Sequence, residues 1–387
     1  EMLRESAEII RTLLSTGAVA EQHPTVAANG ANYLVVWEDS RNATANGTDL
    51  YGARVSTNGV PLDLNAIPIS TAPGDQLLPS VTANGSSPSG ADYLVVWEDY
   101  RNAAATGVDI YGARVSTAGS VLDATGISIS TGSANQFAPA VAGTGSGYLV
   151  VWQDARTAVD TGWNIYGARL NSSGTVLDTS GIPICTALRD QFAPAVASGT
   201  TNYLVVWADA RNQGTTDQDI YGSRLTFGGT VLNLDGLAIS RAAGDELAPA
   251  VTASGSDYFV VWQDARNLGA TDYDIFGARV TGAGVVSDPA GLPIAVATEA
   301  QTFPSVAASG TNLFVVWQDS RNLGVSGLDV YGSRVSSSGG VLDPSGLAIN
   351  TNPGAQQMPV MASGSPRAFL VVSRGVRDGA ERIVANL

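Results

Sequence analysis

The chain has 387 residues, of which 44 are glycine and 44% are hydrophobic, and this is enough apolar material for a folded core. Its formal net charge is −15 and all 20 basic residues are arginines, so an acidic surface argues against nucleic acid or an anionic membrane as a partner. No apolar stretch is long enough to span a bilayer, and the single cysteine, Cys185, excludes an internal disulfide bond.

The N-terminus divides into two parts. Residues 1–11 are predicted to form a tail or a short helix, because Met2 to Leu13 comes nearest to a helical spacing of apolar residues. Leu13 to Thr16, within residues 12–16, instead line up with Pro68 to Thr71, which is the end of the repeat that follows. The predicted domain is therefore residues 12–387.

One phrase recurs along the rest of the chain and begins as Tyr33-Leu34-Val35-Val36-Trp37-Glu38-Asp39-Ser40-Arg41-Asn42. The tryptophans of the first two copies are 60 residues apart, and the next four follow at intervals of 55 residues. A seventh, altered copy contains Phe369-Leu370-Val371-Val372-Ser373. A fixed period of this length indicates a repeat architecture.

Each copy predicts four strands, A to D, because its apolar runs are short, rich in β-branched and aromatic residues, and bounded by Gly, Asn, Asp and Ser. Strand A has small residues such as Ser80 and Ala140, as expected near a crowded axis. Strand B is continuously apolar, and strand C contains a glycine such as Gly52, which indicates a bulge or a close backbone approach. Four-stranded units of this kind predict an all-β fold, a seven-bladed β-propeller.

The ends of the chain predict how the ring closes. The seventh copy stops at Leu387, which aligns with the end of strand C, and so it has no strand D. Residues 12–16 supply a strand D that has no strands A to C before it. Pairing of the two removes exposed sheet edges, which soluble proteins avoid. The alternative is an open β-solenoid, although its units are usually shorter.

The hairpin between strands B and C resembles the blade signature of TolB-type (WD40-like) propellers. The resemblance rests on Asp264-x-Arg266-Asn267 followed by Asp274-Ile275-Phe276, and on its sisters that end in Asp-Ile-Tyr. It covers this hairpin in six of the seven copies, and it implies the fold and, more loosely, docking to proteins of the cell envelope. Some related propellers are lyases that hold a metal with several histidines. This chain has one histidine, His23, so that activity is not supported.

The repeated Asp and Arg of this hairpin have two interpretations, a ring of charges that engages a ligand or a structural ion pair in each blade. Six copies of one pair, from Asp39–Arg41 to Asp319–Arg321, favour the structural pair, because a binding site normally breaks symmetry. The repeated tryptophan is likewise expected in the core between blades. Cys185 stands where sister repeats have Ser70 and Ser130, and we expect a small, semi-buried residue there.

A second ring stands at a fixed distance before strand A, and it is the candidate ligand-binding ring at the mouth of the axial channel. Amides and carboxylates suit sugar hydroxyls or a cation, and they equally suit hydrogen bonds to the neighbouring backbone. The ring consists of Glu21, Gln76, Gln136, Gln191, Glu246, Gln301 and Gln356. Trp163, in a B–C loop, is a further candidate, either for stacking on a sugar or for packing on its own loop. His23 is expected to be a tolerated variant.

The B–C loops also offer oxygen ligands to a hard cation such as Ca²⁺. The candidate metal residues are Asp209, Asn212, Asp217 and Asp219. Their spacing does not match an EF-hand, and Asx residues also stabilise turns without a metal. We therefore expect no cofactor, with Ca²⁺ as the exception to consider.

These features favour a non-catalytic binding or scaffold propeller that recognises a protein or a glycan through the channel mouth. We expect a monomeric domain that is extracellular or in the cell envelope. One alternative is a polysaccharide-active hydrolase or lyase that uses paired carboxylates on the same face. Another is a structural spacer within a larger surface protein.

Overall fold

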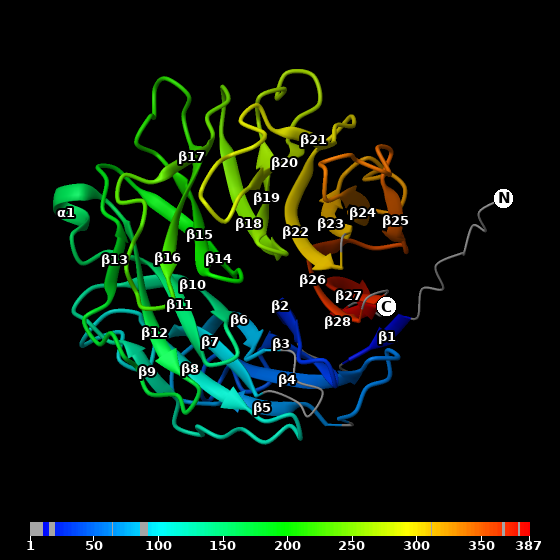
Figure 1. The fold of residues 1–387 in the computed structure, drawn as a ribbon. Helices are drawn as coiled ribbons and strands as arrows, with labels where there is room; N and C mark the ends of the chain where they lie inside the picture. The colour runs from blue at the N-terminus through cyan, green and yellow to red at the C-terminus, as the bar shows by residue number, and fades with distance from the viewer. Residues whose placement is uncertain are drawn as a thin grey trace.

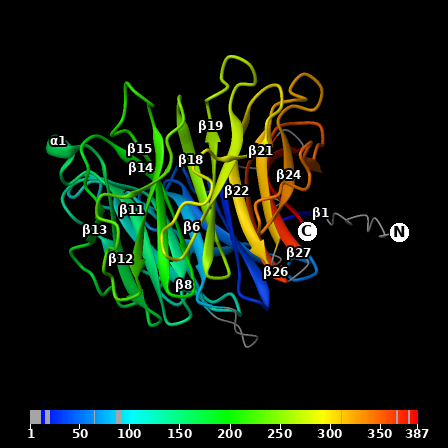
Figure 2. The ribbon, with the colours of Figure 1, turned by 45° about the horizontal axis from the view of Figure 1, so that its top comes forward.

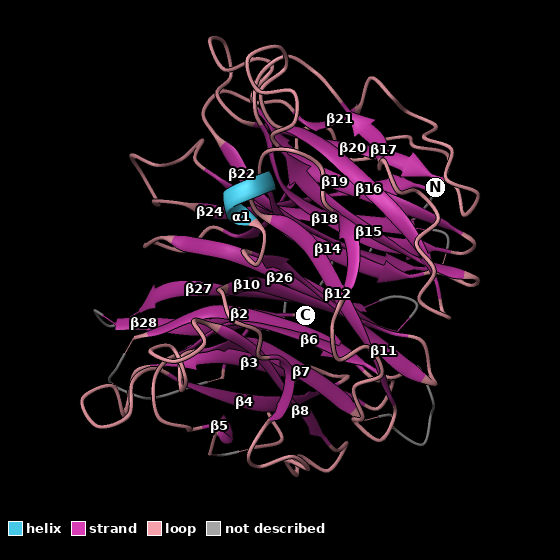
Figure 3. Cartoon of the chain, turned by 90° about the vertical axis from the view of Figure 1, so that its left-hand side faces the viewer, coloured by secondary structure: helices cyan, strands magenta, loops and turns pink. Residues whose placement is uncertain are grey.

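The computed structural model of the chain is a closed ring of seven four-stranded antiparallel sheets (Figure 1). It describes residues 11–14, 20–63, 65–85, 92–310, 312–365, 368–377 and 380–387. Nearly all regular structure is strand, and the described exception is the one-turn helix α1 (Ala158–Thr161) (Figure 3). None of the described helices is long and apolar enough to cross a membrane. The all-β, seven-bladed prediction is confirmed.

Each blade runs from strand A to strand D in chain order. Blades 1 to 3 contain β2 (Glu21–Ala28), β3 (Asn32–Asp39), β4 (Asp49–Ser56), β5 (Ile67–Ser70); β6 (Gln76–Ala83), β7 (Tyr93–Asp99), β8 (Asp109–Val115), β9 (Ile127–Ser130); β10 (Gln136–Gly143), β11 (Gly147–Asp154), β12 (Asn164–Asn171), β13 (Ile182–Cys185). Blades 4 to 6 contain β14 (Gln191–Ser198), β15 (Asn202–Asp209), β16 (Asp219–Thr226), β17 (Leu237–Ser240); β18 (Glu246–Ser254), β19 (Asp257–Asp264), β20 (Asp274–Val280), β21 (Leu292–Ala295); β22 (Gln301–Ser309), β23 (Asn312–Asp319), β24 (Asp329–Ser336), β25 (Leu347–Asn350).

Blade 7 is assembled from both ends of the chain. It contains β26 (Gln356–Ser365), β27 (Ala368–Arg377), β28 (Ala380–Asn386) and β1 (Arg11–Leu13). Strand β1 pairs antiparallel with β28, with Arg11 opposite Asn386 and Leu13 opposite Val384. The predicted closure by an N-terminal strand is confirmed, and β1 and β28, from the two ends of the chain, lie on the same side of the ring in Figure 1. The predicted tail falls mostly on residues 1–10, which lie outside the described residues.

Strand A is the innermost strand of every blade, and each strand A packs against strand A of both neighbouring blades. These strands surround the centre of the ring, and they run obliquely to the outer strands in the tilted view (Figures 1 and 2). At one end of the axis, residues of five strands A, including Thr82, Val141 and Thr252, line a cavity of about 300 Å³. The axial channel is therefore lined at this end by small apolar and hydroxyl side chains.

The core lies between blades, as ridges of strands B and C pack against the neighbouring sheet. Trp97 of blade 2 packs with Leu34, Val36 and Leu50 of blade 1, and the other blade junctions repeat this arrangement. Strand B is buried along almost its whole length, as its apolar run predicts. At Gly52 of strand C, an added Cβ would lie 2.8 Å from the carbonyl oxygen of Val35, so the close backbone approach predicted from the glycine is confirmed.

Candidate functional site: the loop face

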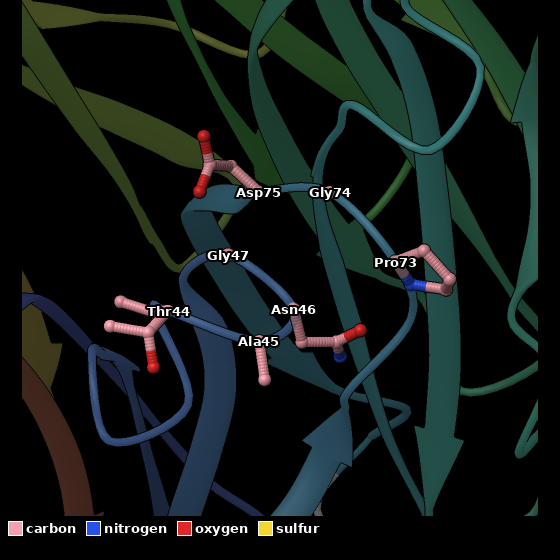
Figure 4. Close-up of a pocket in the computed structure, with 8 residues that line it drawn as sticks. Thr44, Ala45, Asn46, Gly47, Pro73, Gly74 and Asp75 are labelled. Atoms are coloured by element: carbon pink, nitrogen blue, oxygen red, sulfur yellow. The ribbon is translucent and has the colours of Figure 1, made fainter.

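The B–C loops and the D–A connections open on one face of the ring, which we call the loop face. The N–H of Thr48, in the B–C loop of blade 1, donates to Asp75 Oδ1 at 2.8 Å in the connection to blade 2. Between them lies a cavity of about 340 Å³, lined by residues 43–47 and 73–75 (Figure 4). The B–C loop of one blade thus contacts the connection that leads to the next blade. The predicted site residues belong to these segments or adjoin them, so we expect them on the loop face.

The predicted ring of amides and carboxylates occupies equivalent positions, at the first residue of each strand A, but its side chains are buried. None of the seven is more than 3% exposed. The Gln76 amide donates to the carbonyl oxygen of Ala72 at 3.0 Å, and those of Gln191 and Gln356 make the matching bonds to Ala187 at 3.2 Å and Asn352 at 3.0 Å. This burial argues against direct contact with a ligand and corresponds to the alternative in which the ring bonds to neighbouring backbone.

The two carboxylates of this ring are held in the same way. Glu246 accepts hydrogen bonds from the Ser240 hydroxyl and from the backbone N–H groups of Ala242 at 3.2 Å and Ile220 at 3.3 Å. Burial raises the pKa of Glu246, because the charged form loses its hydration. Glu21 accepts from the backbone N–H of Ile383, and this bond ties blade 1 to blade 7 across the closure.

A different ring lies two residues further along each strand A. Its seven members all have positive φ, between 45° and 51°, although none is glycine. They are His23, Leu78, Ala138, Ala193, Ala248, Phe303 and Met358. Each marks a shift in register between strands A and B, as between Leu77 and Ser80 in blade 2. Leu78 and Phe303 are 38% and 43% exposed. The bulge therefore turns these side chains of strand A toward solvent on the loop face.

The bulge is held across the blade junction by the residue that follows the repeated tryptophan. Glu38 Oε1 accepts the N–H of Leu78 at 2.7 Å, and Glu98 Oε1 accepts that of Ala138 at 2.8 Å. In three other blades a neutral glutamine makes this bond. These glutamines are Gln153, Gln263 and Gln318. Blades 1 and 2 therefore differ from their sisters by carrying acids here.

The two acids have different environments. Burial raises the pKa of Glu98 to about 7, with a smaller contribution from the charge of Glu38. The hydroxyl of Tyr100 lies 3.4 Å from Glu98 Oε2 and donates to it, while burial raises the pKa of Tyr100 to about 12. Glu38 Oε2 lies 2.9 Å from His23 Nδ1. Glu38, at the junction of blades 1 and 2, therefore contacts an imidazole, and Glu98, at the junction of blades 2 and 3, is partly protonated near neutral pH.

Trp163 follows helix α1 and is the one tryptophan outside the blade junctions. The other six of the chain's seven tryptophans are fully buried. The Trp163 ring packs on Phe137 of β10 with centroids 5.3 Å apart and planes at 34°, and Trp163 stays partly exposed. The backbone N–H of Trp163 donates to Asp190 Oδ1 at 2.9 Å. Trp163 therefore packs within the loop face and still leaves aromatic surface open to solvent.

The repeated Asp and Arg form a structural unit, which confirms the structural interpretation. In blade 2, Asp99 is fully buried, accepts from Trp97 Nε1 at 2.8 Å, and receives Arg101 Nε and Nη2 at 2.7 and 2.6 Å. The guanidinium also lies 4.2 Å from the centre of the Tyr111 ring. The same contacts recur in blades 1 and 3 to 6, so these charges satisfy one another.

The candidate metal residues of blade 4 do not converge on one point. Asp209 is bound by Arg211, while the Asn212 amide donates to Asp219 Oδ2 at 2.6 Å. Asp217 has a φ of 66° and its Oδ1 accepts the N–H of Gly214 at 3.4 Å. Among the residues that the structure describes, no three His, Cys, Asp or Glu side chains are grouped so as to hold a metal ion.

Cys185 is buried, 2% exposed, at the end of strand D in blade 3. Burial raises the pKa of its thiol, and Arg211 Nη2 lies 3.3 Å from its sulfur. A thiol of this kind is not activated as a nucleophile.

Comparison with known proteins identifies the fold and no family. No family description and no curated protein matches the sequence. A protein of unknown function from Dyadobacter fermentans superposes with a TM-score of 0.57 at 11% identity, over 97% of this chain and 96% of that chain. The α-L-arabinanase of Penicillium chrysogenum, complexed with arabinobiose, superposes with a TM-score of 0.50 at 13% identity, over 81% and 93% of the two chains. The TolB-type resemblance stays a prediction.

Proposed function

We propose that this propeller binds a glycan through its loop face, and that Trp163 is the main contact. The observation that carries the proposal is the partly exposed Trp163, whose ring packs on Phe137, while the six tryptophans of the repeat are buried. Aromatic rings present a large flat apolar surface with a small entropy cost on binding, and they suit the C–H faces of sugars. The arabinanase complex supplies a first ligand class to test, arabinan and its oligosaccharides.

Binding is favoured over turnover because four buried glutamates of this face already have structural hydrogen bonds. Glu38 and Glu98 accept the same backbone N–H groups that neutral glutamines accept in three other blades. The acids of the predicted ring are buried under the D–A connections. A channel-mouth role for this ring would therefore be indirect, through the position of the loops.

The test is a Trp163→Val exchange, which installs the residue of blade 2 at this position. We expect binding on a glycan array that includes arabinans, and about tenfold or more weaker affinity in the variant, since one stacked ring contributes on the order of 1–2 kcal/mol. Tyr273→Val, at the same position in blade 5, is the matched control and should bind normally. An array without hits, or equal affinity of both variants and the parent, would refute the proposal.

One observation favours a second candidate, hydrolysis of a glycan by Glu98 and Glu38. A carboxyl with a pKa near 7 beside a second carboxylate is the pairing that general acid catalysis on a glycosidic bond requires. Release of reducing ends from a polysaccharide panel, lost in both Glu98→Gln and Glu38→Gln, would establish it. Unchanged glycan binding without turnover in the parent protein would exclude it.

A further inference from the structure

Strand C begins with a fully buried acid or amide in each of the first six blades. These residues are Asp49, Asp109, Asn164, Asp219, Asp274 and Asp329. In the aspartates, Oδ2 accepts from the asparagine of the B–C loop, as from Asn212 at 2.6 Å and from Asn322 at 2.8 Å. One carboxylate oxygen per blade is thus satisfied by the loop itself.

The other carboxylate oxygen, Oδ1, has no hydrogen-bond partner in blades 2, 4, 5 and 6, within the part of the chain that the structure describes. The residues concerned are Asp109, Asp219, Asp274 and Asp329. Each is 0% exposed, so water from the bulk does not reach this oxygen. A buried acceptor without a partner costs free energy, and each such group in a native protein calls for an unseen partner.

Blade 1 shows what fills this position. There Asn46 Nδ2 donates to Asp49 Oδ1 at 3.2 Å and also to the carbonyl oxygens of Thr71 and Ala72. Figure 4 shows Asn46 beside the segment that leads to Pro73. The amide nitrogen is thus surrounded by three oxygens, one of which is a buried carboxylate oxygen.

The sequence explains why the other blades differ. The position of Asn46 is taken by Thr106, Thr216, Thr271 and Ser326, in loops of the same length. Their shorter hydroxyls donate to the already bonded Oδ2, at 3.1, 3.1, 2.9 and 3.0 Å. The place of the Asn46 amide nitrogen is therefore left without a donor in blades 2, 5 and 6. In blade 4, Arg241 Nε lies 3.9 Å from Asp219 Oδ2 and brings a positive charge to this carboxylate.

We propose that a hard cation, of the Na⁺ or Ca²⁺ class, occupies this place in blades 2, 5 and 6. Its ligands would be Oδ1 of the buried aspartate and the two carbonyl oxygens that correspond to Thr71 and Ala72, which are those of Thr131 and Gly132 in blade 2. Oxygen-only ligands with one carboxylate and several carbonyls are what hard cations prefer. The site depends on backbone oxygens, which is why no cluster of metal-binding side chains marks it.

Blade 3 has the neutral Asn164 with an unpartnered Oδ1, and without a carboxylate charge it holds no cation. The proposal therefore gives three sites. Blade 1, which has the asparagine, blade 3, which has no carboxylate, and blade 4, which has the arginine, serve as internal comparisons.

The experiment exchanges residues between blades. Thr106→Asn gives blade 2 the amide of blade 1, and Asn46→Thr gives blade 1 the hydroxyl of blade 2, so each variant keeps a residue that the repeat already tolerates. Bound cation is counted by equilibrium dialysis with ⁴⁵Ca²⁺ and, in a separate arm, by ²³Na⁺ exchange. The melting temperature is measured in NaCl, CaCl₂ and choline chloride at equal ionic strength.

We expect three bound ions in the parent, two in Thr106→Asn and four in Asn46→Thr, with a melting temperature that is lower in choline chloride. Asp109→Asn should also lose one ion. Binding in one arm alone identifies which of the two cations fits. No bound ion and equal melting temperatures in all three salts would overturn the proposal and assign the place to buried water. A stoichiometry that both exchanges leave unchanged would also overturn it.

Discussion

At the scale of single residues, the buried aspartate at the end of strand B is neutralised by an arginine of the same blade. Each buried aspartate at the end of strand B accepts from a tryptophan two residues before it and from an arginine two residues after it, and the arginine lies over an aromatic ring of strand C. Blade 7 has Ser373 and Gly375 in place of the tryptophan and the aspartate, while Arg377 stands at the position of the arginine, so the complete unit is absent there. A buried carboxylate without its arginine would be costly, and each of the six blades that has the aspartate also has the arginine.

Glu98 carries a prediction about pH. Its pKa is raised to about 7, above the ordinary 4.5, so the folded state holds the proton more tightly than the unfolded state. The resulting stability is present in full below about pH 4.5 and is lost as the pH rises through 7. We expect Glu98→Gln to unfold at higher urea than the parent at pH 8, by about 1–3 kcal/mol, and to match it near pH 4.5. The reciprocal change in blade 3, Gln153→Glu, should destabilise the protein at pH 8. An equal effect of Glu98→Gln at both pH values would contradict this account.

At the scale of elements, the shortest strand has a role out of proportion to its length. Strand β1 contributes three residues, yet it covers the edge of β28. Leu14, directly after β1, is buried in the cluster that contains Trp37 of blade 1 and Ala385 of blade 7. Closure of the ring therefore depends on both backbone pairing and apolar contact at one junction.

Deleting residues 1–14 should destabilise the whole ring. The deletion removes the buried Leu14 and the three paired residues of β1, and it exposes the edge of β28. We expect the free energy of unfolding in urea to fall by about 2–4 kcal/mol and the tendency to aggregate to rise. Deleting residues 1–10 leaves β1 in place and is the control. If the longer deletion unfolded at the same urea concentration as the control, closure by β1 would make no contribution to the free energy of unfolding.

At the scale of the whole molecule, no blade has a core of its own. Each hydrophobic cluster combines residues of two adjacent blades, so the ring is stable only when every blade has a neighbour on both sides. Arg11 lies opposite Asn386, so the start of β1 is next to the end of the chain. The covalent chain is interrupted in blade 7, but strand pairing and side-chain packing continue across the interruption.

This arrangement predicts that the position of the termini can move. A permutant that joins Leu387 to Arg11 through a short turn, and opens the chain between Ala83 and Tyr93, should fold with a circular dichroism spectrum like that of the parent, because all strand pairs are kept. Its melting temperature should lie within about 5–10 °C of the parent, since only loop entropy changes. The same opening without the new join is the control and gives two fragments. A permutant that does not fold would show that β1 closes the ring differently.

Strand order, blade number and closure could be predicted from the sequence because each depends on a period and on local residue types. The tryptophan spacing counts the blades, and the alternation of glycine, asparagine and β-branched runs marks the strands. The structural nature of Asp99 and Arg101 was also predictable, since six identical pairs indicate architecture. The candidate ring from Glu21 to Gln356 was expected just before strand A and forms the first residue of each strand A, but the burial of its side chains was not visible in the sequence.

The sequence by itself determined the repeat, its four strands and the pairing of its two ends. The tertiary structure decided which side chains reach solvent, because that depends on the neighbouring blade. The bulge at Leu78 turns strand A between Gln76 and Pro79, and its N–H is held by Glu38 of another blade. Contacts of this kind join residues about 40 positions apart, and no local pattern reports them. For this reason, the burial of the ring, the acid pair Glu38 and Glu98, and the unpartnered aspartate oxygens emerged only when the blades were packed together.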